Sequence, residues 1–340
     1  MTPEPSGRPA DPTTTAEATR GDDARRTDDP RHPEDSQNNI LDELQALVTE
    51  QRNPRTHDID LADPESVLRM INDEDRTVPE VVRGQIPAIA EAVRLAERSL
   101  RAGGRLLYIG AGTSGRLGVL DAAECPPTFG SDPAQVVGVL AGGMETLIRS
   151  REGIEDRDGA AVEDLSALAL SSPDTLVAIT ASRRTPYAVA GLRYAREVGA
   201  STVFITCNVP PADLQADVVI SAVVGPEVVA GSTRMKAGTA QKLILNMIST
   251  ATMIRLGKVY ENLMVDLRPL SRKLEERSKG ILVKLLGVSY AEASRLLDDA
   301  GGSVKQALFM GWTGSDASEA ARRLEAAGGV LRRALEGGNR

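Results

Sequence analysis

The 340-residue sequence contains few aromatic residues, only two cysteines and only two histidines. Aromatic residues make up 3% of the chain, so the core must come from the aliphatic part of its 41% hydrophobic composition. Cys125 and Cys207 lie far apart, which argues against a disulfide framework and fits a reducing cytoplasm. One of the two histidines, His32, lies in a polar N-terminal stretch, so no histidine-based metal site is predicted.

Long apolar runs and an excess of basic residues are also missing. No stretch approaches about 18 consecutive apolar residues, and the N-terminus has no apolar signal segment, so we expect neither a membrane span nor a secretory leader. The net charge is −8 and no basic stripe is visible, which argues against nucleic acid as the main partner. These features predict a soluble protein of the cytoplasm.

Residues 1–38 are rich in Pro, Asp, Arg and Thr and nearly free of aliphatic residues, a composition that predicts a disordered tail. Beyond residue 39, apolar strands alternate with helical patterns. The predicted strands are Leu106–Ile109, Val136–Leu140, Thr175–Thr180, Thr202–Thr206 and Val218–Val224. The predicted helices are Ser66–Asn72, Val78–Ala102 with a break at Pro87, Arg116–Glu124, Ile154–Ala169, Pro186–Val198 and Met235–Leu256. Buried strands separated by helices indicate an α/β fold with a doubly wound, mainly parallel five-stranded sheet within residues 39–270.

After residue 270 the chain becomes more charged and its pattern is helical throughout. We expect a small all-helical domain at residues 271–340. Its predicted helices are Leu282–Gly287, Tyr290–Asp298, Val304–Met310 and Ala317–Leu335.

A glycine-rich loop follows the first predicted strand of the sheet. Gly110, Gly112 and Gly115 match the spacing of a dinucleotide-binding loop, but no acidic residue follows the next strand where a ribose would need one. Thr113 and Ser114 instead supply hydroxyl groups, and a helix begins here, which favours a phosphate-binding loop. Ligands of such sheets bind at the carboxyl ends of the strands, near a switch in strand order.

Two more loops at predicted strand ends carry hydroxyl groups. Ser182, Arg184 and Thr185 precede one helix, where the simpler interpretation is an ordinary helix cap. Ser232 lies in the loop that precedes the longest helix. The recurrence of such loops in one sheet favours phosphate binding.

Three glutamates are candidates for proton transfer. Glu124 has apolar neighbours and is followed by two prolines, which we expect to end its helix. Glu155 lies near the start of the next predicted helix. Glu227 is a third candidate, although an ion pair with Arg234 or Lys236 explains it equally well.

Taken together, five motifs resemble the N-acetylmuramic acid 6-phosphate etherases, a family within the sugar isomerase (SIS) fold group. The motifs are Thr49–Pro54, Gly110–Gly118, Glu124–Gly130, Arg184–Tyr187 and Gly231–Lys242. The resemblance implies that Glu124 is the catalytic proton donor and Glu155 the second catalytic glutamate. It also implies a homodimer and a C-terminal domain similar to the ubiquitin-associated fold. One departure is Arg183, which stands where the family has glycine.

The resemblance implies a lyase that acts in the recycling of cell-wall amino sugars. It would cleave the D-lactyl ether of N-acetylmuramic acid 6-phosphate and give N-acetylglucosamine 6-phosphate and D-lactate. The carbonyl of the open-chain sugar would stabilise the carbanion, so no cofactor is expected. Two alternatives remain open: an aldose–ketose isomerase of hexosamine phosphates with Glu227 as its base, and a non-catalytic phosphosugar-binding regulator.

Overall fold

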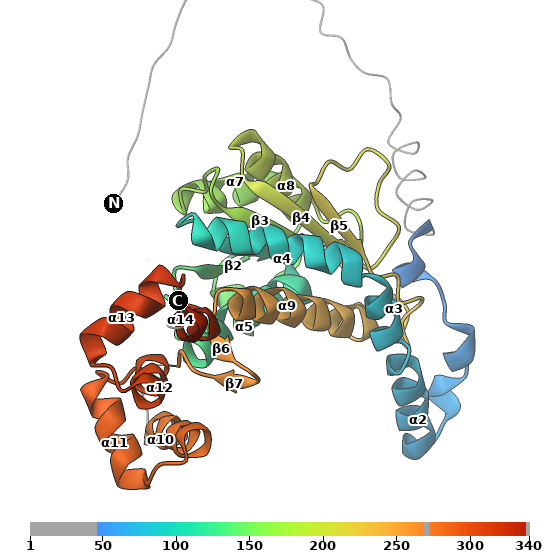
Figure 1. Ribbon diagram of the computed structural model, residues 1–340. Coiled ribbons are helices and arrows are strands. Elements are labelled where there is room, and N and C mark those ends of the chain that lie inside the picture. The colour runs from blue at the N-terminus through green and yellow to red at the C-terminus, as the bar shows by residue number, and fades with distance from the viewer. Residues whose placement is uncertain (1–45, 268–271, 338–340) are drawn as a thin grey trace, which may run out of the picture. The chain divides into compact units, whose positions relative to one another are not determined.

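A computed structural model describes residues 46–267 and 272–337 (Figure 1). At its centre is one parallel sheet with the strand order β2-β1-β3-β4-β5. The strands are β1 Leu106–Gly110, β2 Val136–Leu140, β3 Thr175–Ile179, β4 Ser201–Thr206 and β5 Val218–Ser221. The predicted doubly wound, parallel five-stranded α/β sheet is therefore confirmed. The predicted tail at residues 1–38 lies outside the described residues.

The strand order changes direction between β1 and β3. Strand β1 is followed in the chain by β2 on one side, whereas β3 pairs with its other side, with Gly110 opposite Ile179 at the carboxyl ends. From β3 the sheet then continues outward through β4 to β5. The loops that leave β1 and β3 therefore flank a crevice at the switch point, where sheets of this kind bind ligands.

Helices cover both faces of the sheet because strand side chains alternate between two hydrophobic clusters. One cluster joins Tyr108 and Val177 to α3, α4, α5 and α9, and the other joins Leu107 and Phe204 to α7 and α8. The helices of this part are α2 Pro64–Asp75, α3 Val78–Gly84, α4 Ile86–Arg101, α5 Gly112–Phe129, α6 Glu145–Ile148, α7 Asp158–Ala167, α8 Pro186–Glu197 and α9 Lys236–Arg255. Three short 3-10 helices precede them, namely η1 Val48–Glu50, η2 Pro54–Thr56 and η3 Ile59–Leu61.

Most predicted elements are found within a few residues of their expected limits, and the break near Pro87 falls at Gln85, between α3 and α4. The expectation that the prolines end the helix of Glu124 is wrong. Helix α5 continues through Pro126 and Pro127 to Phe129 and ends at Gly130, which has a φ of 61°. Burial of Cys125 and Phe129 holds this last turn in place, and the φ of proline is compatible with a helix.

The C-terminal part is helical as predicted, although two of its helices differ from expectation. Helix α10 begins at Arg272, ten residues before the predicted start, and the predicted helix Ala317–Leu335 is divided at Gly328 and Gly329, which both have positive φ. The helices are α10 Arg272–Leu286, α11 Tyr290–Asp299, α12 Val304–Thr313, α13 Ala317–Ala326 and α14 Leu331–Glu336.

These C-terminal helices share a third hydrophobic cluster with residues beside the hairpin of β6 Val259–Tyr260 and β7 Leu263–Met264. Val265 and Leu267 belong to this cluster, although both precede the predicted domain boundary. That boundary, near residue 270, lies outside the described residues and stays a prediction, as does the ubiquitin-associated fold. None of the described helices combines the length and apolar character needed to span a bilayer.

Candidate active site

The first loop joins β1 to α5 and places a helix N-terminus at the switch point. Gly112 opens α5 with a φ of 55°, a conformation that L side chains rarely adopt. A Cβ atom on Gly115 would come within 2.4 Å of the Gly110 carbonyl oxygen, so glycine there lets the helix approach the strand closely. Ala111, at the N-cap position, has no polar side chain to accept the first N–H groups of α5. These N–H groups and the hydroxyls of Thr113 and Ser114 suit an anionic group.

The second loop joins β3 to α8 and is held together by its own hydroxyl groups. The Thr180 and Thr185 hydroxyl oxygens are 2.7 Å apart, and Thr180 also donates to the Ser182 carbonyl at 2.7 Å. The Ser182 hydroxyl accepts the backbone N–H of Arg184. Thr185, at the N-cap position of α8, makes no capping hydrogen bond with its side chain. The simpler interpretation of Thr185 as an ordinary helix cap is therefore wrong.

The third loop joins β5 to α9 and meets the first loop. A Cβ atom on Gly238, in the first turn of α9, would lie 3.5 Å from the Thr113 methyl group, so the N-termini of α5 and α9 are in contact. Ser232 lies in this loop and is half-buried. Its backbone N–H donates to the Val229 carbonyl.

Glu155 lies beside the first loop. It is in the loop before α7, because that helix begins at Asp158 rather than at the predicted Ile154. Gly112, Arg116 and Glu155 line one small pocket. The Glu155 carbonyl accepts the backbone N–H of Tyr187, in the first turn of α8, at 3.0 Å. Glu155 therefore links the first loop to the second.

Arg116 fixes the chain that leads to Glu155. Its guanidinium donates to the carbonyls of Thr146 at 2.6 Å and Leu147 at 3.1 Å, and to the Ser150 hydroxyl at 3.0 Å. The sequence around Gly115 does not predict these contacts of Arg116, because the residues that accept its hydrogen bonds follow the next strand, β2. Arg116 is thus a site residue that sequence reasoning missed.

Glu124 lies apart from this group. It is exposed and is more than three turns further along α5, about 18 Å from Gly112 at roughly 1.5 Å of rise per residue. Within one chain, the structure brings Glu155 to the first loop but does not bring Glu124 there.

Glu227, the third candidate base, caps α9. Its two carboxylate oxygens accept the backbone N–H groups of Lys236 and Ala237, each at 2.9 Å. Its side chain is fully buried, and burial raises its pKa above the ordinary value. Glu227 therefore has the structural role that the sequence left open, but through the Lys236 backbone, because the Lys236 ammonium lies 2.6 Å from Glu74 instead.

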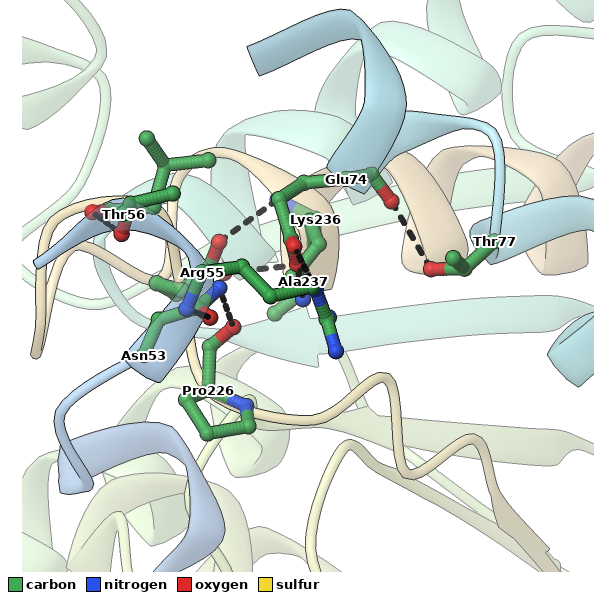
Figure 2. Close-up of polar contacts among 10 residues, drawn as sticks. Asn53, Arg55, Thr56, Glu74, Thr77, Pro226, Lys236 and Ala237 are labelled. Carbon is green, nitrogen blue, oxygen red and sulfur yellow. Dashed lines mark hydrogen bonds and ion pairs between the residues drawn. The ribbon is translucent and has the colours of Figure 1, made fainter. Parts of the chain in front are cut away.

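Figure 2 shows how this buried ion pair supports the third loop. Glu74 also accepts two hydrogen bonds from Arg55, which lies just after the Thr49–Pro54 motif. Asn53 donates to the Pro226 carbonyl, and Thr56 donates to the Val228 carbonyl at 2.8 Å. The N-terminal segment therefore binds the third loop from outside the sheet.

Thr49 anchors the same segment to the strand ends. The Asn208 amide, just after β4, donates to the Thr49 hydroxyl at 2.9 Å and to the Ala181 carbonyl at 3.0 Å. The Thr49 carbonyl accepts the backbone N–H of Gly231. No sequence pattern predicts a role for Asn208, and Thr49 is indicated only by its place in the Thr49–Pro54 motif. They tie the second loop to the third.

The strand order and the loops at the carboxyl ends of β1 and β3 define the class of protein, a parallel α/β domain with its site at the switch point. The family model for the glucokinase regulatory protein N-terminal SIS domain matches residues 88–196, which include β1, β2, β3 and the first two loops. A phosphoheptose isomerase from Neisseria gonorrhoeae has a similar solved structure, with a TM-score of 0.41 and 18% identity, covering 55% of this chain and 97% of that one.

Sequence relatives are more specific. The chain is 51% identical to an N-acetylmuramic acid 6-phosphate etherase of Clostridium beijerinckii over 269 residues, covering 78% of this chain and 88% of the relative. It is 53% identical to the protein of the same name from Oceanobacillus iheyensis over 268 residues, covering 78% of this chain and 91% of the relative. The chain belongs to the N-acetylmuramic acid 6-phosphate etherase family.

Proposed function

We propose that this chain is a lyase that cleaves the D-lactyl ether of N-acetylmuramic acid 6-phosphate. The products are N-acetylglucosamine 6-phosphate and D-lactate. Membership of the etherase family supports this activity. The observation that carries it in the structure is the pocket at the switch point, which is lined both by Gly112, at the N-terminus of α5, and by Glu155.

The phosphate would bind to the three loops. Gly112 offers its backbone N–H at the start of α5, and the hydroxyls of Thr113 and Ser114 lie in the same turn. Ser182, Arg184 and Thr185 would contribute from the second loop and Ser232 from the third. The second-loop hydroxyls that now bond to one another would exchange those bonds for phosphate oxygens.

The reaction is an elimination followed by an addition. In the open-chain sugar, the C2 proton is acidic because the C1 aldehyde stabilises the carbanion. A base removes this proton, the C3–O bond breaks, and the departing lactate oxygen takes up a proton. Water then adds across the C2–C3 double bond, with its oxygen bonded to C3 and a proton returned to C2. Each step needs a carboxyl group that can hold or release a proton.

We assign the two proton transfers to Glu155 and Glu124. Glu155 lies in the pocket beside the first loop and is suited to act at C2 and on the added water. Glu124 would protonate the departing lactate. Since it lies about 18 Å from Gly112 along α5, we propose that it enters the site of a second copy of the chain.

A homodimer through α5 and α9 suits the surface of these helices. Leu120 on α5 is 54% exposed, and Met247 and Ile254 on α9 are 40% and 50% exposed. Large apolar side chains on adjacent helices favour burial against a partner. A dimer formed there would cover the exposed face of α5 that also carries Glu124.

A cytoplasmic location is part of the same proposal. Cys125 and Cys207 are free, and both thiols are buried. Burial raises the pKa of each to about 12, so neither is a reactive thiolate. Free thiols are usual in a reducing compartment.

Neither alternative is favoured. A hexosamine-phosphate isomerase needs a base that shuttles a proton between C2 and C1, but both oxygens of Glu227 hold the start of α9. A non-catalytic regulator is not favoured because the relatives at 51% and 53% identity are etherases by name.

The test is an assay of lactate release from N-acetylmuramic acid 6-phosphate by the purified chain. Glu155→Gln and Glu124→Gln should each lower kcat by about a hundredfold or more while N-acetylglucosamine 6-phosphate still binds. Glu163→Gln, on the exposed surface of α7, is the matched control and should keep wild-type activity. Isomerised sugar phosphate without lactate would contradict the proposed function. Full activity of Glu124→Gln would contradict only the assignment of the proton donor.

A further inference from the structure

A second concave surface lies on the outer side of the second loop. It is a groove of about 580 Å³ between α8 and residues 211–215. Arg183 and Arg184 line it from the loop, and Arg193 and Arg196 line it from α8. Its volume lies within the range of small-molecule sites, which is about 300–1,000 Å³. Of the residues assigned above to catalysis or to the sugar phosphate, only Arg184 lines this groove.

The groove concentrates positive charge on a protein of net charge −8. Four arginines line it against two aspartates, Asp158 and Asp213. None of Arg183, Arg193 and Arg196 forms an ion pair with another described residue. Guanidinium groups are suited to phosphate because they offer paired N–H donors in a plane. The charge therefore favours a phosphorylated ligand.

The arginines lie at two levels of the groove, one before α8 and one within it. Arg183 and Arg184 immediately precede the helix, whereas Arg193 and Arg196 are three residues apart and share one face. The rise from Pro186 to Arg193 is about 10 Å at roughly 1.5 Å per residue. This spacing fits two anionic groups on one ligand. Apolar side chains such as Val189 and Leu214 line the groove, and Asp158 and Asp213 can accept hydrogen bonds from ligand hydroxyls.

The backbone of Arg183 fits this position without strain. Glycine is required at a turn only where φ is positive, and among the described non-glycine residues only Ala169 and Glu261 have positive φ. The departure from glycine at residue 183 therefore leaves the loop conformation accessible. What the arginine adds is a half-buried cation on the wall of the groove.

We propose that this groove is an anion site for a small organic bisphosphate, separate from the site of the sugar phosphate. Arg183 would bind one phosphate, and Arg193 and Arg196 the other, whereas Arg184 stays assigned to the sugar phosphate. Because Arg183 and Arg184 lie between Ser182 and Thr185, an occupied groove would hold the second loop in place. The ligand would therefore change KM for the sugar phosphate more than kcat. The expected change in KM rests on the proposed function, whereas binding of the bisphosphate in the groove does not.

Calorimetric titration of the full chain with fructose 1,6-bisphosphate tests the proposal, with and without saturating N-acetylglucosamine 6-phosphate. We expect one saturable site per chain that the monophosphate does not block. Arg193→Ala/Arg196→Ala and, separately, Arg183→Gly should each weaken binding by about tenfold or more. Inorganic phosphate should bind at least about tenfold more weakly than the bisphosphate.

The matched control is Arg69→Ala/Arg76→Ala, which removes the same charge from α2 and the residue that follows it, where the two side chains are 74% and 76% exposed. It should bind the bisphosphate as the wild type does. Absence of saturable binding, equal affinity in the groove variant and the control, or displacement by N-acetylglucosamine 6-phosphate would each overturn the proposal. A chain that binds the bisphosphate but releases no lactate would contradict the proposed function alone.

Discussion

Glu74 is a buried carboxylate that stays charged between two cations. Its side chain is 3% exposed, and it accepts hydrogen bonds from Arg55 and, at 2.6 Å, from Lys236. The Arg55 hydrogen bonds, and then the one from Lys236, lower the pKa of Glu74 from 4.5 to about 2. A buried pair of this kind is costly to break because the remaining charge is left without a partner. Glu74 thereby fixes the start of α9 and, with it, the third loop.

The depressed pKa of Glu74 predicts a pH dependence of stability. The stabilisation is fully present above a pH of about 4.5 and is lost as the pH falls toward about 2, because over this range the unfolded chain takes up a proton that the folded protein does not. The free energy of unfolding of the wild type should exceed that of Glu74→Gln by an amount that shrinks over this range, by up to about 3 kcal/mol. Urea unfolding at a series of pH values measures it.

Glu91→Gln is the control for this measurement. Glu91 pairs with Arg94 on the surface of α4 with its side chain 59% exposed, so the difference from wild type should stay small and nearly constant with pH. If the Glu74→Gln difference were equally constant down to pH of about 3, Glu74 would titrate at its ordinary pKa and the network would not hold its charge.

At the scale of elements, Asp121 joins α5 to α9 and to β1. Its buried carboxylate accepts the Tyr108 hydroxyl at 2.9 Å, the Asn246 amide at 2.6 Å and the Ser249 hydroxyl at 3.1 Å. Glu124 lies one turn further along the same helix. The alignment of α5 against α9 therefore determines where Glu124 is presented.

Asp121→Asn should test this alignment. The substitution places an NH₂ group where the carboxylate now accepts from several donors, and should lower the free energy of unfolding by about 1–3 kcal/mol. It should also lower kcat with little change in KM, since the phosphate loops are left intact. Tyr108→Phe removes a single hydrogen bond and should cost about 1 kcal/mol. Asp73→Asn, on the exposed face of α2, should change neither quantity, and an Asp121→Asn protein with wild-type kcat would contradict the positioning role.

The sequence predicted elements better than it predicted contacts between them. Runs of buried aliphatic residues mark each strand, and glycines at strand ends mark the loops, so the sheet and the first loop could be located. Pairings such as Lys236 with Glu74 join residues 162 positions apart, and no local pattern indicates them. Likewise, whether prolines end α5 depends on how tightly Cys125 and Phe129 are packed, which a sequence pattern does not reveal.

At the scale of the whole molecule, the separation of Glu124 from Glu155 decides how an active site is completed. Glu155 lines the pocket with Gly112, whereas Glu124 lies about 18 Å along α5. In a two-fold symmetric dimer, each site would take Glu155 from one copy and Glu124 from the other. Two different inactive variants would then complement each other in a mixed dimer, because one of its two sites would contain both intact glutamates.

Glu124→Gln and Glu155→Gln proteins, unfolded together and refolded as a mixture, should therefore regain lactate release. Random pairing gives mixed dimers for half of the population, each with one intact site, so activity should reach about a quarter of the wild-type value. Either variant refolded alone should stay inactive, and Glu163→Gln mixed with Glu155→Gln should give only the activity of the Glu163→Gln copies. If both glutamates act within one chain, every site in the mixture contains one substituted glutamate. No gain over the separate variants would then be measured, and the shared site would be excluded.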